Sequence, residues 1–235
     1  MKKLFFVWIF GVLAMFTAAV TLCVQTLFLP QTVGSFDDGE MRIVLDVGHG
    51  GVDGGVKGLV TGVKESDVNL AIAYCLKEKL EDFGFAVTMT RKTEGGLYGT
   101  PTKGFKRRDM EKRKEIIEKT APALVISIHQ NFYPSRRVRG GQVFYNAANE
   151  KSRILGKTVQ TYLNELYEEA GVKARESKAG EYFILQCTPY PSVIVECGFL
   201  SNAEDEKLLC LDGWKNRLAE QIALGTMAYF SGNLT

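Results

Sequence analysis

Residues 41–49 read MRIVLDVGH, a short apolar run that ends in a histidine and continues into the glycine-rich stretch 50–55, GGVDGG. Two further runs have the same form. Residues 123–129, ALVISIH, end in the chain's other histidine, and residues 192–196, SVIVE, end in a glutamate. Continuous apolar runs bounded by turn residues are typical of strands that are buried on both faces of a sheet. The three runs therefore predict strands that each carry a polar group at the carboxyl end.

The segments between these runs have the 3.6-residue periodicity of amphipathic helices. The helix after the first strand is predicted to begin with Ser66 as its N-cap and to stop at Gly84. The expected strands are 42–47, 85–90, 123–128, 141–145, 182–185 and 192–196, and the expected helices are 66–83, 106–119, 150–170 and 213–230. Strands that alternate with helices predict a single α/β layered domain, with a mixed sheet of about six strands and helices on both faces.

The polar residues at the strand ends predict a common site. In α/β sheets, ligands bind at the carboxyl ends of the strands, and a helix that follows a strand begins at that same edge. His49, His129 and Glu196, with Glu65 at the start of the first helix, can therefore meet on one rim. Two imidazoles and one carboxylate are the ligand set of an open, catalytic zinc site.

A second carboxylate is needed at such a site to take a proton from water and deliver it to a leaving group. Glu196 is the candidate, because apolar or small neighbours surround it in the sequence and partial burial should keep its pKa from falling. Asp46 and Asp53 are candidates for partners that orient a histidine.

Each of these residues also has a structural interpretation. A histidine after a strand is often a satisfied structural residue, the glycines can form an ordinary turn, and Glu196 can cap a helix or pair with a cation. A cysteine nucleophile at Cys197 is disfavoured, because no activating partner is evident in the sequence and a buried thiol is inert. The mixed-charge stretch 103–115 predicts a solvated helix face, part of which could meet anionic polymers.

The composition and motifs argue against nucleic-acid binding, C-x-x-C metal or redox sites and a phosphate-binding loop. The formal net charge of +2 is too small to indicate nucleic-acid binding. The five cysteines form no C-x-x-C pair, and the phosphate-binding G-x-x-x-x-G-K-[ST] motif is absent.

The N-terminus predicts a membrane anchor. The segment Leu4–Leu29 contains no charged residue, and about 20 apolar residues are enough to cross a bilayer. Lysines precede it and acids follow, which favours an N-terminus inside the cell and a domain outside. We expect an anchor or transmembrane helix over 1–29, a linker over 30–40 and the folded domain over 41–235. The alternative is a long cleaved signal peptide, which would release the domain as a secreted form.

Five ordered motifs resemble those of one enzyme family, the zinc-dependent N-acetylmuramoyl-L-alanine amidases known as Amidase_3. They are residues 49–55 (HGGVDGG), 65–70 (ESDVNL), 90–91 (TR), 127–131 (SIHQN) and 195–202 (VECGFLSN). The resemblance implies that His49, Glu65 and His129 hold one Zn2+ per chain and that Glu196 is the catalytic glutamate. It implies hydrolysis of the amide between the lactyl group of muramic acid and L-alanine in peptidoglycan stem peptides.

Within the family, an anchored domain without wall-binding repeats resembles the sporulation and germination amidases of the CwlD type. That resemblance implies a role in forming muramic-δ-lactam in the spore cortex. The segment between Asn131 and residue 141 is too short for the long blocking helix of autoinhibited division amidases. The need for an activating protein partner is left open. A non-catalytic wall-binding module and a zinc peptidase that cuts within the stem peptide are the alternative functions.

Overall fold

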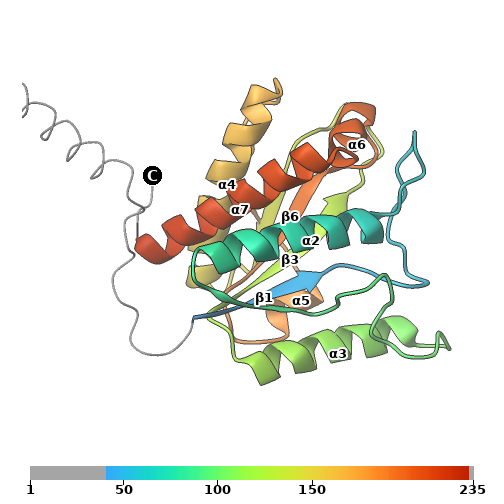
Figure 1. Ribbon diagram of the computed structural model, residues 1–235, viewed down its shortest axis with the longest axis vertical. Helices are drawn as coiled ribbons and strands as arrows, with labels where there is room; N and C mark the ends of the chain where they lie inside the picture. The colour runs from blue at the N-terminus through green and yellow to red at the C-terminus, as the bar shows by residue number, and fades with distance from the viewer. Residues whose placement is uncertain (1–40, 233–235) are drawn as a thin grey trace, which may run out of the picture. The chain divides into compact units, whose positions relative to one another are not determined.

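The computed structural model describes residues 41–232 (Figure 1). The expected anchor over 1–29 and the linker over 30–40 lie outside the described residues. Within 41–232, no helix has the length and hydropathy of a membrane span.

A six-stranded mixed sheet forms the centre of the domain, in the order β2-β1-β3-β6-β4-β5. The strands are β1 (Arg42–Val47), β2 (Ala86–Met89), β3 (Leu124–Asn131), β4 (Gln142–Tyr145), β5 (Lys178–Ala179) and β6 (Ser192–Phe199). Strands β2, β1, β3 and β6 run parallel, whereas β4 is antiparallel to β6. The carboxyl ends of β1, β3 and β6 therefore meet at one edge of the sheet.

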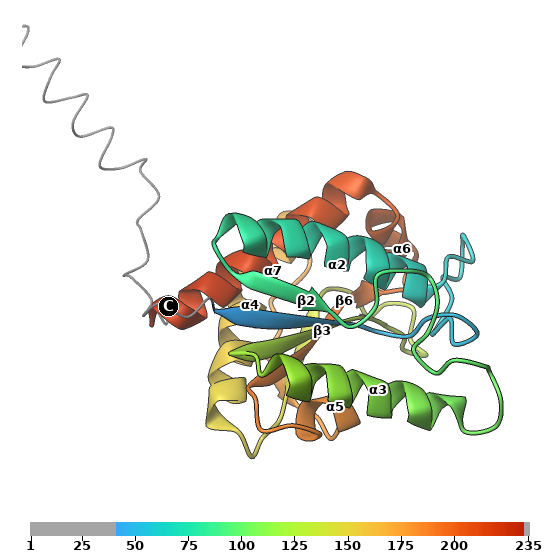
Figure 2. The same cartoon turned by 60° about the horizontal axis from the view of Figure 1, so that its bottom comes forward.

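Helices cover both faces of the sheet, as the sequence predicted (Figure 2). They are α2 (Glu65–Asp82), α3 (Phe105–Thr120), α4 (Glu150–Glu169), α5 (Phe183–Gln186), α6 (Ala203–Leu209) and α7 (Asp212–Ser231). The larger core lies under α2, α4 and α7, and the smaller core lies under α3 and α5. Strand β1 supplies both cores by alternation, because Ile43, Leu45 and Val47 face the larger one and Val44 faces the smaller one.

Three local expectations were wrong. Residues 182–185 do not form a strand, because residues 183–186 make the short helix α5 and the edge strand is the earlier pair β5. A run of four apolar residues cannot distinguish the two states, since Ile184 and Leu185 are buried against the smaller core in either.

The second wrong expectation concerns the start of α2. The N-cap is Lys64 rather than Ser66, and the helix begins at Glu65. The third is an omission. Helix α6 was not predicted, although Asn202 caps it by accepting hydrogen bonds from the backbone N–H groups of Glu204 and Asp205.

Candidate active site

His49 lies in a turn that is held by backbone and side-chain contacts rather than by strand pairing. It follows β1 and has a left-handed backbone with φ of 59°, a conformation that costs a residue with a side chain about 1 kcal/mol or more. Its carbonyl oxygen accepts a hydrogen bond of 2.8 Å from Nη2 of Arg113 on α3. The arginine therefore stabilises the turn that aims the imidazole over the rim.

Glu65 is fixed as an acceptor at the first residue of α2. Its side chain is buried, and its two oxygens accept hydrogen bonds from the backbone N–H groups of Val56, at 3.0 Å, and Gln130, at 3.1 Å. Burial acts to raise the pKa of Glu65, but hydrogen bonds from His129 and His49 outweigh it and lower the pKa well below its usual range. Glu65 is therefore a carboxylate at neutral pH.

The two histidines converge on the same oxygen of Glu65. Oε1 lies 3.2 Å from Nε2 of His49 and 2.9 Å from Nδ1 of His129. One potential ligand atom from each of the three residues lies within 4.8 Å of the other two. His129 reaches this point at an irregularity in the register of β3 with β6, between His129 and Asn131, where a β-bulge can redirect side chains. The three side chains form a compact donor set that is compatible with a single metal ion.

Two glycines leave the space that the side chains of the donor set occupy. A Cβ atom on Gly48 would lie 2.4 Å from Cε1 of His129. A Cβ atom on Gly55 would lie 2.4 Å from Oε2 of Glu65, and Gly55 also has a φ of 68°. Both glycines are required by close approach, so the glycine-rich stretch is more than a flexible turn.

The two candidate orienting aspartates have different roles. Asp53 Oδ2 lies 3.2 Å from Nδ1 of His49, which leaves Nε2 of that ring toward Glu65. Asp46 makes no such contact. It is buried on the α3 side of β1, where Arg113 and Ser127 donate to it at 2.7 and 2.6 Å. Burial acts to raise the pKa of Asp46, but the charge of Arg113 and these hydrogen bonds lower it.

Glu196 lies beside His129 across the β3–β6 pair and has an environment opposite to that of Glu65. Its Oε2 atom is shielded from solvent and has no hydrogen-bond partner among the described residues. Burial raises the pKa of Glu196 to about 7. An unpaired carboxyl group that faces the donor set is suited to exchanging protons there, and this position does not support a capping or salt-bridge role.

Arg113 corrects the prediction that the whole stretch 103–115 is solvated. Its guanidinium is buried and donates to Asp46, to Asp109 at 2.6 Å, and to the carbonyl oxygens of Val47, at 2.6 Å, and His49. The missed signal is the spacing of Met110, Arg113 and Ile117, which places Arg113 on the apolar face of the helix.

Arg91 makes a second set of contacts with the same turn. Its guanidinium donates to the carbonyl oxygens of Val47, Gly48 and Ser66, at 3.1, 2.9 and 2.8 Å. It thereby joins the end of β1 to the first turn of α2, the two elements that carry His49 and Glu65. Burial lowers the pKa of Arg91 to about 10, which leaves it charged at neutral pH.

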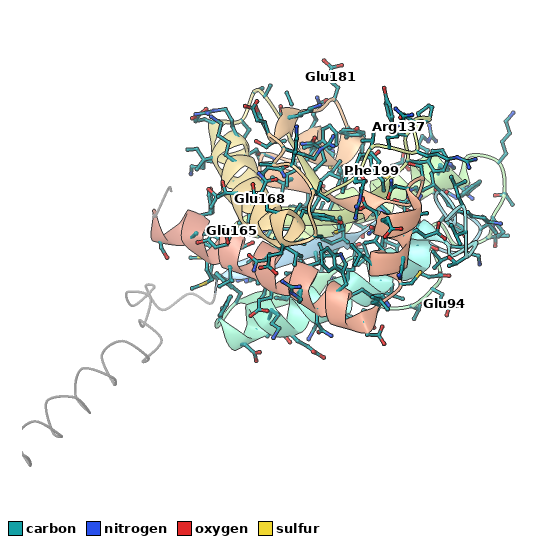
Figure 3. The ribbon with its side chains drawn as sticks, turned by 90° about the horizontal axis from the view of Figure 1, so that it is seen from above. Glu94, Arg137, Glu165, Glu168, Glu181 and Phe199 are labelled. Atoms are coloured by element: carbon teal, nitrogen blue, oxygen red, sulfur yellow. The ribbon has the colours of Figure 1, made fainter. Side chains whose placement is uncertain are left out.

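A cavity of about 310 Å3 lies against the donor set. His49, His129 and Glu196 line it together with residues of α3 and of the region around α5, and residues of β1, β6 and the loops after β1 and before α3 also contribute. No helix covers it from the β3–β4 connection, because residues 132–141 contain none, and Arg137 lies on this connection at the surface (Figure 3). The cleft is therefore accessible to a ligand.

The four cysteines within residues 41–232 take no part in this site. Cys75, Cys187, Cys197 and Cys210 are free thiols, and Cys197 is buried. Burial raises the pKa of the Cys197 thiol far above its usual value, so it stays protonated and unreactive.

Comparison with known proteins identifies the family to which this geometry corresponds. The family model described as N-acetylmuramoyl-L-alanine amidase (Amidase_3) matches residues 43–227. The chain is 33% identical over 192 residues to the germination-specific N-acetylmuramoyl-L-alanine amidase of Bacillus subtilis, covering 80% of this chain and 79% of that protein.

Solved structures show the same likeness. The CwlD amidase of Clostridioides difficile, solved in complex with the GerS lipoprotein, is 33% identical and superposes with a TM-score of 0.78 over 82% of this chain and 100% of that one. The catalytic domain of the amidase CwlV from Bacillus (Paenibacillus) polymyxa is 26% identical and has a TM-score of 0.70 over 81% and 98% of the two chains.

Replacement of Arg113 tests the arginine contacts beneath the site. Arg113→Met leaves Asp46 as a buried charge without its cation, so we expect the free energy of unfolding to fall by about 3–5 kcal/mol. Urea denaturation followed by circular dichroism measures the change. Arg107→Met on the same helix is the control, because its side chain is 83% exposed and the expected change is within about 0.5 kcal/mol. Equal stability of the two variants would show that the buried arginine is not structurally important.

Proposed function

The chain belongs to the Amidase_3 family of N-acetylmuramoyl-L-alanine amidases and is a peptidoglycan hydrolase, and we propose that it works with one zinc ion held by His49, Glu65 and His129. The bond cut is the amide between the lactyl group of N-acetylmuramic acid and L-alanine of the stem peptide. Glu196 serves as the proton carrier of the reaction. The observation that carries this proposal is the convergence of the three donor groups beside the unpaired carboxyl group of Glu196.

The chemistry of the donor set fits zinc. Two imidazole nitrogens and one carboxylate oxygen match the ligands of catalytic zinc sites, which leave a further position open for water or substrate. Asp53 at Nδ1 of His49 is the kind of partner that fixes the tautomer of a ligand histidine. The glycines at 48 and 55 keep the space around the three side chains free of other side chains.

A bound zinc ion supplies Lewis acidity, which polarises the substrate carbonyl and makes water more acidic. The residues of the chain supply orientation and proton transfer. Glu65 remains ionised, since two backbone N–H groups donate to its carboxylate and the imidazoles of His49 and His129 lie against it. The cleft beside it accepts the substrate with its amide between the donor set and Glu196.

Glu196 accepts a proton from the attacking water and then delivers it to the nitrogen of the departing L-alanine. A group that must do both works best with a pKa near the working pH, and burial moves Glu196 in that direction. Its Oε2 atom has no internal partner to compete with water or with the leaving amine.

We propose a finer role for this chain, in sporulation and germination. The B. subtilis relative is described as germination-specific. We propose that this chain acts in the spore cortex, where it releases stem peptides on the route to muramic-δ-lactam. The N-terminal charge pattern supports a domain at the outer face of the cytoplasmic membrane, anchored by residues 1–29 or secreted if that segment is cleaved. Protease added to intact protoplasts would reach a domain in that position.

A protein partner is part of the same proposal. The C. difficile relative was solved with a lipoprotein bound, and a comparable partner would meet this domain outside the membrane. Peptidoglycan remains the substrate, and no nucleic-acid partner is proposed.

Zinc content tests the ligand assignment. The wild-type protein loaded with zinc should hold one ion per chain, and His49→Ala or His129→Ala should abolish tight binding because two ligands cannot replace three. Elemental analysis after dialysis measures the content. Asp53→Asn keeps all three ligands and should weaken affinity by about 10–100-fold, measured by competition with a chelator. Full occupancy in both histidine variants would show that the ligands are other residues.

Glu196→Gln tests the proton carrier. The change preserves shape and removes the base, so hydrolysis of denuded peptidoglycan should fall by about 10²–10⁴-fold while zinc stays bound. Release of stem peptides measures the rate. Glu181→Gln is the control, because Glu181 is an exposed glutamate adjacent to α5 (Figure 3) and its loss should leave the rate unchanged. Loss of zinc from Glu196→Gln would make Glu196 a ligand, and unchanged activity would place the base elsewhere.

A further inference from the structure

The lining of the cleft beside the donor set includes both a lysine and exposed aromatic side chains. Lys106 comes from the first turn of α3. Tyr182 and Phe183 come from the start of α5, and apolar groups of β6 and α5 line the cleft as well. A substrate with two chemically different arms can therefore be oriented by this cleft.

Lys106 is a cationic side chain in the lining that is not fully paired with acceptors of the protein. Arg113 also lines the cleft, but its nitrogens are bonded to Asp46, Asp109 and backbone carbonyl oxygens. The side chain of Lys106 is 70% exposed, and its Nζ lies 3.6 Å from Oδ1 of Asp53. That distance exceeds a good hydrogen bond, so this pair is weak and exchangeable.

Asp53 does not fully neutralise Lys106, because it is shared. Its other oxygen lies 3.2 Å from Nδ1 of His49. An anionic group entering the cleft can therefore become a partner of Lys106 without breaking the contact between Asp53 and His49. A mobile lysine ammonium at a cleft is suited to capturing a carboxylate.

The aromatic part of the lining suits a neutral ligand. Tyr182 is 42% exposed and Phe183 is 48% exposed, although both are large apolar or aromatic side chains. The Tyr182 ring packs edge-on against Phe144 with centroids 5.4 Å apart, which fixes its position. An exposed aromatic ring in a fixed position, such as that of Tyr182, offers a flat surface to the apolar face of a sugar ring.

The inference rests on the proposed function, in which a glycan arm and a peptide arm meet at the scissile amide. The glycan arm is neutral near that amide, because the lactyl carboxyl group is consumed in the bond. The peptide arm bears free carboxylates beyond L-alanine. We propose that Lys106 is a specificity residue that binds the carboxylate of the second stem residue, so that the peptide arm lies along the start of α3 and the glycan arm lies toward Tyr182 and Phe183.

Kinetics with two matched substrates test the assignment. Both are disaccharide stem peptides, one with a free α-carboxylate on the second residue and the other with that group amidated. We expect Lys106→Gln to raise KM for the free carboxylate about five- to tenfold, to leave kcat within about twofold, and to change little on the amidated substrate. Lys106→Arg should restore most of the preference. The control is Lys103→Gln, an exposed lysine nearby that does not line the cleft.

Binding measurements separate failure of this inference from failure of the proposed function. Calorimetric titration of Glu196→Gln and of Glu196→Gln/Lys106→Gln with the same two ligands needs no turnover. A loss of affinity in the double variant for the free carboxylate alone supports the assignment, even if the wild type proves to cut another bond. Equal affinities in the two proteins would overturn it. A fall in kcat of Lys106→Gln on both substrates, or a fall in its zinc content, would also overturn the assignment. Lys106 would then act through Asp53 and His49.

Discussion

The buried guanidinium of Arg113 is the contact on which the candidate site depends. It pairs with Asp46 inside the smaller core and also satisfies carbonyl oxygens at the end of β1. These carbonyl groups lie where the chain leaves β1 and turns. A buried carbonyl oxygen without a hydrogen-bond donor would destabilise the fold. Arg91 satisfies Gly48 and links the turn to α2. The left-handed conformation of His49 persists because these donors surround it.

The same frame places two glutamates in opposite environments. Glu65 receives donors from both histidines and from the backbone, so its pKa falls and it remains an anion. Glu196 has an unpaired, shielded oxygen, and burial raises its pKa. Two carboxyl groups with pKa values moved apart are the arrangement by which one site combines a fixed negative charge with a mobile proton. The ligand and proton-carrier roles proposed for them follow from this difference.

The sequence predicted these three strands because the apolar runs at 42–47, 123–128 and 192–196 are largely buried and parallel strands align their carboxyl ends. That alignment was enough to bring His49, His129 and Glu196 to one rim. The predicted ends of β3 and β6 were too early, because these strands continue to Asn131 and Phe199. Arg113 was missed because charge pattern alone assigns a charged helix to solvent, whereas one turn of α3 faces Asp46. The secondary structure of residues 182–185 could not be predicted, because their apolar side chains can be buried against β6 from a helix as well as from a strand. The ligand roles themselves stay predictions.

The bond that is cut is the most direct test of the account. Denuded peptidoglycan digested by the zinc-loaded protein and analysed by mass spectrometry should yield intact stem peptides with N-terminal L-alanine and glycan strands that retain muramic acid. Fragments cut within the stem peptide, with L-alanine still attached to muramic acid, would contradict the account and make the enzyme a peptidase.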